Sequence, residues 1–148
     1  MKNLTEEQRK TKKIKNEEKK KYLQSYNDYK EEAKRLEEQL EEVKMGKILP
    51  SMVGSDMPSS HNQKDLSDYI VQCDELIEKI IKKRKQAIER FTEVQQKIEK
   101  MKNENEKTVL TLRYLKKCKW TKIACEIGVE WAQVHRIHAK ALEHFEMS

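Results

Sequence analysis

Residues that break helices are scarce in this sequence: it has three glycines and two prolines among 148 residues. It also has no stretch in which apolar and β-branched residues alternate, the pattern expected of a half-buried strand. Hydrophobic residues make up 36% of the chain and charged residues 39%, which is too little apolar material for one large core. We therefore expect an all-α protein that packs its helices in an elongated way.

Long apolar runs are missing as well. No segment approaches the roughly 18 apolar residues that cross a bilayer, and the first ten residues, MKNLTEEQRK, lack the apolar core of a signal peptide. These absences exclude a membrane span and predict a cytoplasmic protein.

Cysteines are few and odd in number, namely Cys73, Cys118 and Cys125, and none forms a CxxC pair. This argues against a disulfide framework. A zinc site can be drawn from Cys118, Cys125, His135 and His138. Structural zinc usually takes ligands in tight pairs on a loop, however, whereas these residues fall within a helical repeat. We therefore expect no metal and no other cofactor.

Signs of catalysis are also missing, because the sequence has no glycine-rich phosphate loop, no HExxH motif and no carboxylate pair in an apolar setting. We do not expect an enzyme. The net charge of +6 and the pI near 9.1 permit contact with a polyanion, but lysines on solvated helices produce the same totals. Charge alone favours nucleic acid only weakly.

Two long segments carry apolar residues at alternating spacings of three and four, the heptad pattern of coiled coils. The first segment, residues 1–45, opens with a lysine-rich stretch that is either a frayed helix or a basic arm. The second segment covers residues 64–105. The first heptad series is Tyr22, Tyr26, Tyr29, Ala33, Leu36, Leu40 and Val43, and the second is Leu66, Ile70, Cys73, Ile77, Ile80, Arg84, Ala87, Phe91, Val94, Ile98 and Met101.

Residues 46–63 separate the two series and hold both prolines, two of the three glycines and four serines. This composition predicts a linker that interrupts the helix. The long helices then form either an antiparallel hairpin within one chain or a coiled coil between chains, and the sequence leaves both open. Arg84, the only charge in the second series, either sets register or oligomeric state or extends out of the seam.

Shorter amphipathic units make up residues 106–148: EKTVLTLRYL, KWTKIACEI and VEWAQVHRIHAKALEHF. Gly128 stands between the last two and suits a turn with positive φ. The residues around it have the types that the core of a helix-turn-helix needs, and they are Ile123, Ala124, Ile127, Gly128, Val129, Val134 and Ile137. The alternative is a plain three-helix bundle in which this match is incidental.

In a helix-turn-helix the second helix lies in the DNA major groove. The residues that we expect to contact bases are Trp131, Ala132, His135 and Arg136, and those expected on the backbone are Lys116, Lys117, Lys119, Lys122, Gln133 and Lys140. Arg136 is the best candidate for reading sequence, because a guanidinium can donate two parallel hydrogen bonds to guanine O6 and N7.

The segment LTLRYLKKCKWTKIACEIGVEWAQVHRIHAKALEHF resembles region 4 of bacterial sigma-70-type factors, the helix-turn-helix that reads the −35 promoter element. It is still more similar to small phage proteins with such a C-terminus, the group around the ArpU and RinA late-gene transcriptional regulators. The resemblance covers roughly residues 48 to 146 and is most specific in the last forty or so. It implies a phage-type, sequence-specific transcriptional regulator that binds double-stranded DNA in a bacterial host cell.

Departures from the sigma pattern carry implications of their own. Where region 4 has arginine, glutamate, arginine and glutamine, this sequence has Trp131, Ala132, His135 and Arg136. The resemblance therefore implies a target other than the ordinary −35 hexamer. Lys119 and Glu130 also replace the serine or threonine that often caps the two helices of the motif.

A second hypothesis is an adaptor that holds RNA polymerase or another protein, with DNA contact minor. In either case the coiled coil is available for a homodimer or for partner binding. The sequence specifies neither the operator nor whether transcription is activated or repressed.

Overall fold

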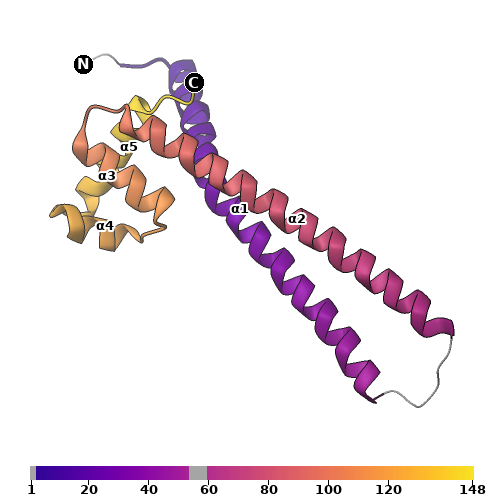
Figure 1. The fold of residues 1–148 in the computed structure, drawn as a ribbon. Coiled ribbons are helices and arrows are strands. Elements are labelled where there is room, and N and C mark those ends of the chain that lie inside the picture. Colours follow the sequence, from indigo (N-terminus) through magenta and orange to yellow (C-terminus); the bar gives the residue numbers. More distant parts are fainter. Residues whose placement is uncertain (1–2, 54–59) are drawn as a thin grey trace. The chain divides into compact units, whose positions relative to one another are not determined.

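The computed structural model describes residues 3–53 and 60–148, with side chains described for 3–46 and 66–148. Every regular element in these ranges is helical (Figure 1), which confirms the all-α fold with long N-terminal helices followed by a helical bundle. The elements are α1 (Glu6–Val53), α2 (Ser60–Glu99), α3 (Glu104–Leu110), the π-helix η1 (Thr111–Leu115), α4 (Trp120–Ile127) and α5 (Trp131–His144). None of the described helices is long and apolar enough to cross a membrane.

The chain divides into two compact units, one made of Met1–Asp28 with Ala87–Ser148 and the other of Tyr29–Gln86. In the second unit α1 and α2 lie side by side as a helical hairpin within one chain (Figure 1). Its core consists of Leu40, Cys73, Leu76 and Ile80, with Leu36, Val43 and Tyr69 packed against it. Lys83 pairs with Glu32 across the two helices at 2.7 Å.

Both helices of the hairpin extend into the predicted linker at 46–63. Helix α1 runs on to Val53, past Gly46 and Pro50, and α2 already begins at Ser60. Residues 54–59 lie outside the described part of the chain. A proline removes one donor and crowds one carbonyl a turn earlier, so the composition of this stretch overstated how far it would disrupt the helix.

The second heptad series is wrong in part. Leu66, Ile70 and Ile77 are exposed, whereas Leu76, which the series omits, is buried. Cys73 can belong to two seams, because Leu76 follows it three residues later and Ile77 follows it four residues later. Helix α1 packs on the side of α2 that holds Leu76. The first series is incomplete as well. It omits Leu23 and Asn27 of α1, and both residues are buried.

Arg84 extends out of the seam rather than into it. Its side chain is 62% exposed, and its guanidinium pairs with Glu37 of α1. Of the two roles that the sequence left open for Arg84, the structure therefore favours the one in which the charge stays in solvent.

The lysine-rich N-terminal stretch is helical from Glu6. A reciprocal pair of hydrogen bonds starts the helix: Gln8 Oε1 accepts from the Thr5 amide at 3.0 Å, and Thr5 Oγ1 accepts from the Gln8 amide at 3.3 Å. Farther along, Lys19 Nζ donates to the Leu142 carbonyl oxygen at 2.6 Å. A cation at a helix C-terminus is favourable because it faces unpaired carbonyls, so this stretch docks on the end of α5.

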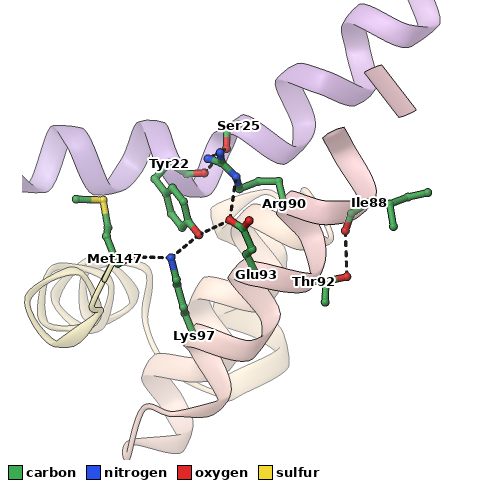
Figure 2. Close-up of polar contacts among 8 residues, drawn as sticks. All are labelled: Tyr22, Ser25, Ile88, Arg90, Thr92, Glu93, Lys97 and Met147. Carbon is green, nitrogen blue, oxygen red and sulfur yellow. Dashed lines mark hydrogen bonds and ion pairs between the residues drawn. The ribbon is translucent and has the colours of Figure 1, made fainter. Parts of the chain in front are cut away.

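The larger apolar core of the first unit lies between the long helices and the C-terminal elements. Its buried members come from both long helices and from the C-terminal elements: Leu23, Val94, Ile98, Met101, Leu110, Tyr114, Leu115, Ala141, Leu142 and Phe145. A polar cluster borders it (Figure 2), in which Tyr22 Oη lies 3.1 Å from Glu93 Oε2 and accepts from Lys97 Nζ at 2.7 Å. Lys97 also donates to the Met147 carbonyl oxygen, so the chain's last residues are held against α2.

Replacing Leu23 with alanine should lower the free energy of unfolding by about 2–5 kcal/mol, because the fully buried side chain leaves a cavity in this core. Urea denaturation followed by circular dichroism measures the change. The matched control is Leu4→Ala, since Leu4 is 40% exposed and should cost well under about 1 kcal/mol. Equal losses in the two variants would contradict the described core.

Candidate nucleic-acid interface

A tight turn joins α4 to α5. Gly128 caps α4 with φ 70° and ψ 36°, the left-handed conformation, which confirms the positive φ expected at this position. Space is not the reason for glycine here, because a Cβ at Gly128 would meet nothing within 4 Å. The Val129 amide donates to the Ala124 carbonyl oxygen at 3.1 Å and closes the turn. The backbone conformation alone therefore calls for glycine.

A small apolar core lies beneath this turn. Ile123, Ala124 and Val134 are buried in it together with Val109 and Leu112 of the preceding helices. The partly buried side chains packed against it are Cys118, Trp120, Ile127, Val129 and Ile137. The structure thus brings together all six of the side chains that were expected, with Gly128, to form a helix-turn-helix core.

Neither helix of the motif has a side-chain N-cap. Lys119 and Glu130 occupy the N-cap positions of α4 and α5 in extended conformation, and neither side chain makes a capping hydrogen bond. The backbone still closes both first turns, because the Ile123 amide donates to the Lys119 carbonyl and the Val134 amide to the Glu130 carbonyl, each at 3.1 Å. Only Glu130 carries the charge that the positive end of a helix favours.

A chain of aromatic contacts links the core of the first unit to the start of α5. Tyr114 Oη and His138 Nε2 share a hydrogen bond of 2.8 Å. The ring of His138 lies edge-on to Trp120 at 4.8 Å, and His135 contacts Trp120 at 4.7 Å and Trp131 at 4.1 Å. We call these five residues the aromatic cluster. It fixes the orientation of α5 about its own axis, because three of its members lie on that helix.

Burial controls the protonation of this cluster. Desolvation lowers the pKa of His138 to about 4, and the nearby cations Lys20 and Arg113 act in the same direction. Desolvation also raises the pKa of Tyr114 to about 12. Both groups are therefore neutral near pH 7, which suits a buried hydrogen bond between them.

His135 is placed differently from the other predicted base-contacting residues. It is half-buried between the two tryptophan rings, and its Nε2 is buried with no hydrogen-bond partner among the described residues. The imidazole of His135 therefore packs against the Trp131 ring. Trp131 itself is 57% exposed at the first turn of α5.

The outer face of α5 is polar and open. Ala132, Arg136 and Lys140 are all exposed and stand four residues apart, so they share one face of the helix, and exposed Gln133 borders it. We call these four residues the outer face of α5. Because Ala132 is small, it adds little side-chain bulk beside the guanidinium of Arg136 on this face.

Exposed lysines cluster where η1 leads into α4. Lys116, Lys117 and Lys119 lie in the connection, Lys117 with φ 56°, and Lys122 lies in the first turn of α4. The connection is held by the backbone, since the Cys118 amide donates to the Leu112 carbonyl at 2.8 Å. The side chain of Arg113 also holds this connection. Its guanidinium donates to the Cys118 carbonyl at 3.1 Å and lies 4.3 Å above the Trp120 ring.

The structural roles of Tyr114, Trp120 and His138 went unnoticed in the sequence. A signal was present, because Trp131, His135 and His138 are spaced four and three and so lie on one side of a helix. Among the described residues, no three or more His, Cys, Asp or Glu side chains form a group that could hold a metal ion.

The chain belongs to the family described as "Protein of unknown function (DUF1492)", whose model matches residues 49–146. No curated protein matches the chain, and no solved structure does. The matched range contains α3 to α5 and every residue of the candidate interface.

Lowering the pH should destabilise the fold through His138. Its pKa is about 4 in the folded chain and 6.5 in the unfolded one, so this contribution is present in full above pH 6.5 and is lost as the pH falls toward 4. Urea denaturation at pH 7.5 and pH 5 measures the loss. A His138→Gln variant should lose less stability between those two values than the original chain, whatever its absolute stability, and identical losses would contradict the assignment.

Proposed function

We propose that this protein is a sequence-specific DNA-binding transcriptional regulator in which α5 enters the major groove. The observation that carries the proposal is the outer face of α5, where Arg136 stands exposed beside a small alanine on a helix held by the aromatic cluster. A rigid helix that presents one arginine and few bulky neighbours suits recognition of a base-pair edge.

Under this proposal the contacts divide into two kinds. Arg136 donates two hydrogen bonds to a guanine and reads sequence, and Trp131 contacts a thymine methyl group or a sugar. His135 acts indirectly, because it supports the Trp131 ring. Lys116, Lys117, Lys119, Lys122, Gln133 and Lys140 bind phosphates or sugars and contribute affinity without sequence choice.

The resemblance to sigma region 4 and to phage late-gene regulators supports this proposal, since it covers nearly the same residues as the family match at 49–146. The proposal accordingly includes action in the cytoplasm of a bacterial host cell, no enzymatic activity, and RNA polymerase as a candidate further partner. The altered base-contacting set, above all Trp131 and Ala132, points to a target other than the −35 hexamer.

One observation favours a second candidate, an adaptor that binds RNA polymerase or another protein. Trp131 is a large aromatic side chain with more than half of its surface exposed, and such residues are enriched in the energetic centres of protein interfaces. Selection of binding sites from a random duplex library at two salt concentrations separates the candidates. An enriched motif supports the regulator, whereas no enrichment with salt-labile or absent binding favours the adaptor.

Arg136→Ala should weaken binding to the selected site by about 1–3 kcal/mol and relax preference at one base pair, because it removes a bidentate contact. Lys122→Ala should weaken all duplexes alike and reduce the salt dependence. Electrophoretic mobility shifts with the selected site and with single-base variants measure both effects.

The matched control for charge is Arg35→Ala, an exposed arginine of α1 in the other unit, which should leave affinity and preference unchanged. If Arg136→Ala lowers affinity equally for every duplex, as the lysine variant does, Arg136 contacts the backbone and does not read bases.

A further inference from the structure

Helix α2 carries a second apolar stripe that its own hairpin does not cover. Leu66, Ile70, Ile77 and Ile81 are 57%, 51%, 39% and 61% exposed. Their spacings of four, seven and four place them on one side of the helix. We call these four residues the outer stripe. Single exposed apolar residues are ordinary, but four on one side of a helix are typical of a helix-packing surface.

The hairpin cannot satisfy this stripe, because α1 packs elsewhere on α2. The residues of α2 in the hairpin core are Tyr69, Cys73, Leu76 and Ile80. At about 100° per residue, the direction of these side chains differs from that of the outer stripe by roughly a quarter of a turn. The stripe is therefore available to a second helix while the hairpin stays intact.

The charges of α2 are divided along its length. Residues 66–78 contain Asp68, Asp74, Glu75 and Glu78 and no lysine or arginine, whereas residues 79–86 contain Lys79, Lys82, Lys83, Arg84 and Lys85 and no carboxylate. A parallel pair of these helices would place like charges together. An antiparallel pair would place the acidic half of each helix against the basic half of the other.

We propose that a second copy of this chain packs antiparallel on the outer stripe. The two halves of α2 are complementary to each other, so the same surface serves both copies of a two-fold dimer. When Ile77 of one copy packs against Ile81 of the other, Asp74 lies one turn away, opposite Arg84 and Lys85. Each copy contributes the same contacts, and the pairing occurs twice.

This inference goes beyond the proposed function and selects the homodimer from the two uses that the sequence left open for the coiled coil. It requires no DNA, so self-association and DNA recognition can fail separately. Loss of DNA reading in the Arg136 variant leaves the dimer intact, and a monomeric chain can still be tested for sequence preference.

Sedimentation equilibrium of the full chain over a range of concentrations tests the stripe. The original chain should form a dimer, and Ile77→Ser should weaken it by about tenfold or more, because the apolar side chain is lost near the centre of the interface on both copies. The matched control is Val71→Ser. Val71 is 53% exposed but lies outside the outer stripe, so its variant should dimerise as the original does. A chain that stays monomeric throughout, or equal weakening by both substitutions, would overturn the proposal.

A charge exchange tests the orientation. Asp74→Lys and Lys85→Asp should each weaken the dimer, since each sets like charges against one another, and the double variant should restore it. A parallel dimer would keep like charges opposed in every variant, so failure of the double variant to recover would overturn the antiparallel arrangement. Circular dichroism verifies that all variants retain their helices.

Discussion

The hydrogen bond between Tyr114 and His138 is the contact on which the placement of α5 depends. Asn27 Nδ2 of α1 donates to the Tyr114 carbonyl oxygen at 2.6 Å. The backbone of Tyr114 is thus held by α1, while its hydroxyl bonds to His138. From there the contacts continue through Trp120 to the first turn of α5. Because burial keeps His138 neutral, the connection needs no counter-charge inside the core.

The two ends of α5 are held by different means, and this leaves its outer face open. At the C-terminal end, Leu142 and Phe145 are buried in the core of the first unit, and His144 lies 2.7 Å from the buried carboxylate of Glu106. At the N-terminal end no side chain caps the helix, and the contacts of His135 with Trp120 and Trp131 hold it instead. A helix fixed at both ends can present Arg136 with little loss of entropy when a partner binds.

Local signals predicted only part of this arrangement. Gly128 was predictable because a single backbone conformation demands it, and the long helices followed from heptad spacing. The seam of α2 was not, because Ile77 and Leu76 fit equally regular patterns and only the position of α1 selects between them. The burial of His135 also escaped the sequence, since a histidine on an amphipathic helix suits solvent, DNA or a tryptophan ring equally well.

The ambiguity that misled the heptad assignment is itself a property of the helix. A sequence that satisfies two registers has two apolar sides, and an intramolecular hairpin can cover only one of them. The apolar side that α1 leaves uncovered lowers solubility unless something packs on it, so a stripe of four such residues favours a partner. The separation of charge along α2 then restricts that partner to one whose charges run the opposite way, and an antiparallel second copy meets this condition without any further sequence.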